Sequence, residues 1–358
     1  MPALLVTSTT AAHAQRLRLT LVDDAGRAPV GGAIVTVLRA DSTRHVEAIV
    51  APSGVRLLSI DMAGTYRLRV RRVGYRPFLS EPITLTAGEE RAITLTLPEQ
   101  RIPLAVVRAV SRARCDVGGA YDGATADALE SARTSLLAAS LAWREQSEPI
   151  EAFTISRQRS MGGFVLDSTR VKFAERFGEP FGSLDAAQLH ERGYVVSDST
   201  SATDDRIYAL PSPGAMISDA FARTHCFALV DDPRDSTRVG IRFEPLRTQP
   251  RADVRGIMWL TRATNDLRAI EFAYTRMSYP GFTPGASGYV RLATLPSGVR
   301  IIDAWYIRMP VFGQYWGGAQ FGHQVRQTAW KEDGGEARAK PVSRPEPEQR
   351  PFAGDLAP

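Results

Sequence analysis

Lysine is scarce in this 358-residue chain: only Lys172, Lys331 and Lys340 occur among 44 basic residues, and arginine supplies the rest. The arginines are spread along the chain and interleaved with 39 acidic residues, for a net charge of +5. A nucleic-acid groove needs clustered basic residues beside stacking aromatics. The distribution therefore predicts no nucleic-acid partner, and the arginine bias is typical of a GC-rich genome.

Long apolar runs are also missing. No stretch approaches the roughly 18 apolar residues that a membrane-spanning helix needs, so we expect no membrane span. The hydrophobic fraction of 44% is that of a globular protein. At this length two domains are the natural expectation.

Histidine and the common catalytic motifs are scarce as well. A zinc carboxypeptidase site needs a His with a Glu three positions later, plus a distant second His, and no histidine here has a Glu three positions later. The chain also lacks GxSxG, Walker and GxGxxG motifs. We therefore predict no catalytic residue, metal or cofactor, although glycosidase-type acid pairs have no sequence signature and leave an enzyme possible. The five histidines are His13, His45, His190, His225 and His323.

The chain has two cysteines, Cys115 and Cys226. In an exported protein they most simply form one disulfide, which would close a loop of about 110 residues. In a reducing compartment they would be two buried thiols. Neither has a partner at CxxC spacing, so a zinc site is unsupported.

The N-terminus, "MPALLVTSTTAAHAQ", places Ala12-His13-Ala14 before Gln15, the small-x-small pattern at which signal peptidase cuts. We interpret residues 1–14 as the remnant of a signal peptide, which predicts export to the periplasm or the cell surface. The alternative is an ordinary N-terminal segment, because the positive n-region is missing.

Residues 15–98 alternate between apolar and polar positions in about seven short segments separated by Gly and Pro turns. This pattern predicts a seven-stranded antiparallel β-sandwich. In "RLRVRRVGYRPF", residues 67–78, we expect Arg67, Arg69 and Arg71 to face water, Gly74 to turn the chain, and Tyr75 with Phe78 to close the end of the core.

The order "GRAPVGGAIVTV", "GTYRLRVRRVGYRPF" and "ITLTAGEERAITLTL" within residues 15–98 resembles the carboxypeptidase regulatory-like domain, a transthyretin-like sandwich also grouped with carbohydrate-binding-like folds. The resemblance implies a fold more than an activity, because this domain is attached to peptidases, to TonB-dependent receptors and to many envelope proteins.

A second domain follows a linker at residues 99–114. Residues 124–146 have the composition and spacing of a helix, and the period then changes to two, with short helices expected at "SLDAAQLHERG" and "AMISDAFART". We therefore predict that residues 115–331 form an α+β domain with a large antiparallel sheet. The charged, Pro-rich residues 332–358 predict a disordered tail.

Parts of this second half, such as "YALPSPGAMISDAFARTHCFALV" and "LPSGVRIIDAWYIRMP", resemble the C-terminal part of exported regulatory-like-domain proteins from Gemmatimonadota-type bacteria. That resemblance implies no activity. The chain as a whole is thus predicted to be mainly β.

One segment carries candidate ligand-binding residues. "VFGQYWGGAQFGH" follows a predicted strand and holds Phe312, Tyr315, Trp316 and Phe321 in a Gly-rich loop, where they could contact a sugar or a partner. The alternative is that they cap the sheet. We predict a non-catalytic envelope protein that binds a glycan or a protein partner, with a hydrolase or a carrier of an apolar ligand as alternatives.

Overall fold

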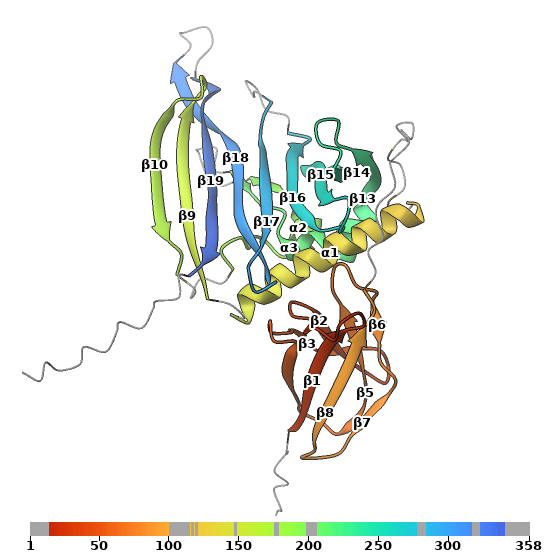
Figure 1. The fold of residues 1–358 in the computed structure, drawn as a ribbon. Helices are drawn as coiled ribbons and strands as arrows, with labels where there is room; N and C mark the ends of the chain where they lie inside the picture. Colours follow the sequence, from red (N-terminus) through yellow and green to blue (C-terminus); the bar gives the residue numbers. More distant parts are fainter. Residues whose placement is uncertain are drawn as a thin grey trace, which may run out of the picture.

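The chain folds into two β-rich domains with a long helix lying between them (Figure 1). A computed structural model describes these ranges: 14–99, 115, 118, 121–146, 149–174, 179–197, 206–277, 284–316 and 323–340. The predicted fold class, a sandwich followed by an α+β domain with a large antiparallel sheet, is confirmed. The predicted signal remnant and linker lie almost entirely outside the described residues.

The N-terminal domain consists of two facing sheets that share one apolar core. One sheet has the order β4-β1-β8; the other has the order β3-β2-β5-β6, with β7 also paired to β5. The sandwich thus has eight strands, and β1 pairs with β8 in parallel. The strands are β1 (Gln15–Asp23), β2 (Ile34–Arg39), β3 (Arg44–Ile49), β4 (Val55–Ile60), β5 (Gly64–Arg71), β6 (Phe78–Leu79), β7 (Ile83–Leu85) and β8 (Glu90–Leu97).

The predicted alternation decides which side chains enter this core. On β5, Tyr66, Leu68 and Val70 are buried while Arg67 and Arg69 are exposed. Gly74 has φ +85°, a left-handed conformation that favours glycine, and it turns the chain after the strand. Tyr75 and Phe78 pack against the core as expected.

The second domain is built on one nine-stranded antiparallel sheet of order β10-β9-β19-β18-β17-β16-β15-β14-β13. Strands β13 to β19 follow one another in the sheet as a meander, and the earlier strand β9 pairs with the last of them, β19. The nine strands are β9 (Ile150–Ser160), β10 (Val165–Lys172), β13 (His225–Asp231), β14 (Arg238–Pro245), β15 (Asp253–Thr261), β16 (Leu267–Thr275), β17 (Ser287–Thr294), β18 (Arg300–Trp316) and β19 (His323–Ala339).

In the part of the second domain that the structure describes, four helices and one small pair of strands lie beside this sheet. The longest, α1, crosses the sheet in Figure 1 and contributes Ala128, Leu129 and Leu136 to the domain core. It begins where the Asp122 side chain accepts a hydrogen bond from the Thr125 amide. No helix in the described ranges is both long and apolar enough to cross a membrane. The remaining elements are α1 (Gly123–Arg144), α2 (Ala186–Arg192), β11 (Val195–Ser197), β12 (Arg206–Tyr208), α3 (Pro213–Met216) and α4 (Asp219–Thr224).

The predicted boundary between sheet and tail at residue 331 is wrong, because β19 continues to Ala339. The acidic residues that suggested a solvated tail are paired across strands: Glu332 lies 2.9 Å from Arg159, and Asp333 accepts a hydrogen bond from Ser156 at 2.6 Å. Charges that have partners on neighbouring strands are compatible with a sheet. Residues 341–358 lie outside the described residues.

Contacts between the domains run along α1. Glu145 near its C-terminus lies 2.8 Å from Arg56 of β4 and accepts a hydrogen bond from the Ile49 amide. Arg71, predicted to face water, is instead half-buried and contacts Glu130 of α1 at 3.2 Å and Glu47 at 3.4 Å. Alternation specifies the face of a strand, and the neighbouring domain then covers part of that face.

Candidate functional site

The predicted aromatic residues lie on the longest hairpin of the sheet rather than in a loop after it. Phe312, Tyr315 and Trp316 belong to β18, which pairs with β19 up to Trp316 and His323, so the loop assignment is wrong for them. The Trp316 side chain is 63% exposed. Phe321 lies outside the described residues. Their role in binding stays a prediction.

The predicted disulfide between Cys115 and Cys226 is confirmed, with a Cα–Cα distance of 5.6 Å. It joins the start of the second domain to β13, the strand at one edge of the sheet. The Cys115 carbonyl also accepts a hydrogen bond from the Arg247 amide. Strand β13 itself was not among the predicted strands.

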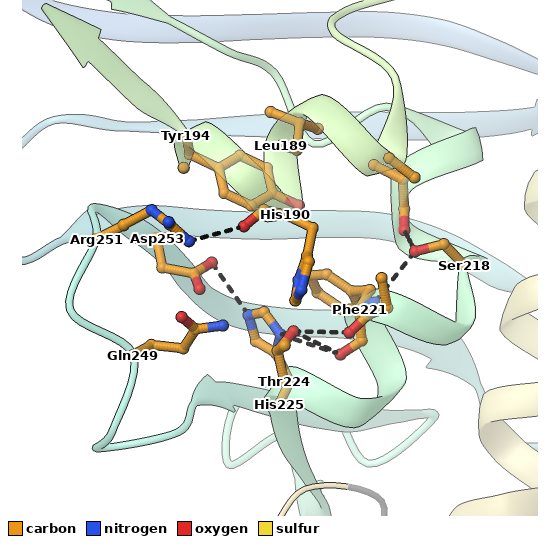
Figure 2. A pocket seen from close by; sticks show the side chains of 14 residues that line it. Leu189, His190, Tyr194, Ser218, Phe221, Thr224, His225, Gln249, Arg251 and Asp253 are labelled. Atoms are coloured by element: carbon orange, nitrogen blue, oxygen red, sulfur yellow. Dashed lines mark hydrogen bonds and ion pairs between the residues drawn. The ribbon is translucent and has the colours of Figure 1, made fainter.

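A buried polar cluster lies where α4 meets β13 and β15 (Figure 2). His225 is 1% exposed; its Nε2 lies 3.1 Å from the Val254 carbonyl oxygen and 3.3 Å from Asp253 Oδ1, and its Nδ1 lies 3.1 Å from the Phe221 carbonyl oxygen. The ring stacks on Phe221 at a centroid distance of 3.9 Å. The Thr224 hydroxyl of α4 also lies 3.1 Å from Nδ1, and it can donate to this nitrogen while Nε2 donates to the Val254 carbonyl oxygen of β15. His225 therefore links α4 to β15.

The cavity beside this cluster has a volume of about 20 Å³, which is room for one water molecule. Burial raises the pKa of Tyr194 well above its ordinary value, and the nearby Asp253 carboxylate raises it further. Because the Tyr194 phenol stays neutral and the cavity holds no more than a water molecule, we interpret Tyr194 as part of the packing and not as a ligand-binding residue. Among the described residues no cluster of three or more His, Cys, Asp or Glu side chains could hold a metal ion.

A much larger groove, of about 350 Å³, lies on the face of β10, β9, β19 and β18. Its floor follows the register of the sheet: Thr169 lies opposite Ser156, Ser156 opposite Asp333, and Asp333 opposite Ile307. The adjoining row runs from Val171 through Thr154 to Gly335 and Trp305 in the same four strands.

Gly335 shapes this floor. A Cβ there would lie 2.3 Å from the Trp305 ring and 2.4 Å from the Phe153 carbonyl oxygen, so only glycine lets the indole lie across β19. The side walls come from Pro180, Gly182 and Ser183 and from Tyr208 and Leu210 beside the sheet.

The groove is polar toward β10 and β9 and apolar toward β18. Thr154, Ser156, Thr169 and Asp333 supply hydroxyl and carboxylate oxygens, whereas Trp305, Ile307, Tyr208 and Leu210 supply apolar surface. Its volume lies in the range of roughly 300–1,000 Å³ that is usual for ligand sites, and a few polar groups amid apolar ones typically orient a ligand. The alternation predicted these strands, but nothing local indicated which four would be neighbours.

Two further depressions each contain an ion pair. One, of about 310 Å³ on the opposite face of the sheet, contains the Arg159–Glu332 ion pair. The other, of about 300 Å³ between the domains, contains Arg300, which lies 2.6 Å from Asp266 and donates to the Leu267 carbonyl.

Residues 16–98, which make up nearly all of the N-terminal domain, match the model of the carboxypeptidase regulatory-like domain. The match ends before the second domain, and the resemblance noted above for the second half stays a prediction. No curated protein matches the chain.

Solved structures give only distant similarities. The pilus 2b backbone protein of group B streptococcus is 15% identical over 24% of this chain and 40% of that chain, with a TM-score of 0.21. The minor pilin GBS52 of Streptococcus agalactiae is 15% identical over 27% and 49%, and the major pilin BcpA of Bacillus cereus is 7% identical over 89% and 95%; both TM-scores are 0.23. The chain covers less than half of the first two pilins, and scores this low support no argument about function.

Proposed function

We propose that this protein is an exported, non-catalytic binding module of the cell envelope and that its ligand is a glycan held in the groove on β10, β9, β19 and β18. The observation that carries the proposal is the floor of that groove, where one row presents Thr169, Ser156 and Asp333 and the next presents Trp305. A sugar ring has hydroxyls at its rim and C–H groups on its faces. It therefore matches a floor with oxygen acceptors at one end and an indole at the other.

The disulfide supports the exported location, because such bridges persist in oxidising compartments and are rare in the cytosol. The regulatory-like domain supports a role as an attached module, although its fold does not specify a ligand.

The groove also bears on the two alternatives. A glycosidase needs two carboxyl groups about 5 to 10 Å apart across the scissile bond. Within the described lining of the groove the carboxylate is Asp333, which already bonds Ser156 and lies 2.8 Å from Lys331. A carrier of an apolar ligand would favour a lining without this hydroxyl-rich row.

Glycan binding is testable with two neighbouring positions on β9. Ser156→Tyr would fill the groove, whereas Arg157→Tyr places the same side chain on the opposite face of the same strand. The full chain is screened on an array of bacterial surface oligosaccharides, and the strongest ligand is titrated calorimetrically. We expect Ser156→Tyr to weaken binding at least tenfold and Arg157→Tyr to change it less than twofold.

A third variant, Trp316→Ala, tests the β18–β19 hairpin, where the sequence analysis placed the candidate ligand-binding residues. If it abolishes binding while Ser156→Tyr does not, the groove is the wrong site. The absence of any glycan ligand would refute the sugar assignment, and turnover of an ester, glycoside or peptide substrate would refute the non-catalytic role.

A further inference from the structure

Strand β10 is an edge strand whose side chains all face solvent. It lies at the end of the nine-stranded sheet with β9 as its one neighbour in the described chain, and each of its eight residues is exposed. Leu166 is 60% exposed, and Phe164 in the preceding turn is 77% exposed. A long exposed edge with apolar side chains is a template for pairing with another strand.

The direction of the main chain shows which groups are available. The Phe173 amide donates to the Ala152 carbonyl of β9, so in the regular part of β10 the alternate residues Val171, Thr169 and Asp167 also face β9. In an antiparallel strand the N–H and C=O of one residue point the same way. Those of Ser168, Arg170 and Lys172 therefore point outward. The Ser168 amide donates to the Asp167 carboxylate in the single chain, and it exchanges that bond for a carbonyl oxygen of the partner strand when two strands pair.

Residue pairing selects a second copy of β10 as the partner. A two-fold axis perpendicular to the sheet brings two β10 strands together antiparallel, with one residue opposite itself. Centred on Thr169, the pairing sets Ser168 opposite Arg170 and Asp167 opposite Val171, so no like charges meet. It also uses only the regular stretch, because the bulge lies before Asp167.

Neighbouring registers are worse. Centring on Arg170 sets two guanidinium groups directly opposite each other, which destabilises a strand pair. Centring on Ser168 draws the bulge at Leu166 into the paired stretch, opposite Arg170. We propose that two copies of this protein dimerise by antiparallel pairing of their β10 strands, with Thr169 on the two-fold axis.

This dimer joins the two grooves. Thr169 and Val171 are the β10 residues that line the groove, and a perpendicular two-fold axis keeps the same face of both sheets on one side. Each copy then places Thr169 and Val171 against the open side of its partner's groove. The shared site rests on the proposed function, whereas the pairing itself does not.

Engineered cysteines test the register directly. The two native cysteines are bonded to each other, so an introduced thiol is the free one. In the proposed dimer the two Thr169 Cα atoms form a non-hydrogen-bonded pair about 4.5 Å apart, which suits a disulfide. The two Val171 Cα atoms are offset by four residues, about 14 Å along the strand. After mild oxidation Thr169→Cys should form at least tenfold more covalent dimer than the control Val171→Cys.

Light scattering of the unmodified full chain should give twice 39.1 kDa at high micromolar concentration. Arg170→Pro removes an outward N–H and leaves the hydrogen bonds to β9, so it should give a folded monomer by circular dichroism. A monomeric unmodified chain, or cross-linking of Val171→Cys in preference to Thr169→Cys, would overturn the pairing. A monomer that still binds the array ligand would overturn the dimer alone and leave the proposed function intact.

Discussion

Removing the Cys115–Cys226 disulfide should cost the second domain about 5 kcal/mol of stability. The bridge closes a loop of 111 residues. In the chain-entropy model such a loop restricts the unfolded chain by about 16 cal/mol/K, which is about 4.8 kcal/mol at 25 °C. The double variant Cys115→Ala/Cys226→Ala releases that restriction. It adds no polar group at Cys115, which is buried.

The assay follows urea unfolding by tryptophan fluorescence. The five tryptophans lie at positions 143, 259, 305, 316 and 330, so the signal reports the second domain alone. At a slope of about 2 to 3 kcal/mol/M, the expected loss moves the midpoint down by about 2 M. Reducing agent should produce the same shift in the unmodified protein and none in the double variant.

A loss below about 1 kcal/mol would refute this reasoning, because it would mean that the unfolded chain is restricted by other contacts or that the native bridge is strained. A shift in the reduced protein that the double variant does not reproduce would have the same consequence.

Three further predictions concern single residues. His225→Ala should destabilise the second domain by about 2 to 4 kcal/mol, because it removes the buried ring that bonds the Val254 carbonyl oxygen and stacks on Phe221. The exposed His190→Ala should cost under about 0.5 kcal/mol. The fluorescence assay above measures both variants, and equal effects would contradict the role of His225. Gly335→Ala should lower the free energy of unfolding by more than about 2 kcal/mol and distort the groove, because its Cβ would meet the Trp305 ring. The control Gly214→Ala, whose Cβ meets nothing within 4 Å, should be nearly neutral. A tolerated Gly335→Ala would show that the indole can move. Burial raises the pKa of Glu145 in the folded protein, and the Arg56 charge opposes that shift, so the folded protein binds this proton more tightly than the unfolded chain does. The stability that results is present at low pH and is lost as pH rises above about 4.5 through the folded pKa. Glu145→Gln should therefore remove this part of the pH dependence of the unfolding free energy.

Much of the local structure follows from sequence patterns. Leu17, Leu19 and Leu21 alternate with polar residues and are buried in the sandwich, and the helix predicted for residues 124–146 is α1, which runs from Gly123 to Arg144. The count of two cysteines was enough to propose their pairing. Strand faces and helices depend on residues that are near neighbours in the sequence, and two cysteines leave a single possible pairing within the chain. Both kinds of information can be read from the sequence alone.

Two errors have a common physical cause. Strand alternation predicts that Arg71 faces water, and the charged, Pro-rich composition of residues 332–358 predicts that Glu332 lies in a tail. Each residue instead has a partner on another element: Glu130 of α1 for Arg71, and Arg159 of β9 for Glu332. A charged residue is tolerated in a sheet or a domain interface when an opposite charge meets it there. That partner is distant in sequence, so local composition cannot reveal it.

The sequence by itself therefore determined the strand faces of the sandwich, the long helix, the disulfide and the resemblance of residues 15–98 to the regulatory-like domain. Only the tertiary structure decided which strands are neighbours, and with that the groove row of Thr169, Ser156, Asp333 and Ile307 and the exposed edge at β10. The reason is that a period of two assigns each side chain to a face without naming the strand beside it. The β9–β19 pairing joins residues more than 150 positions apart, and it is this contact that assembles the candidate site.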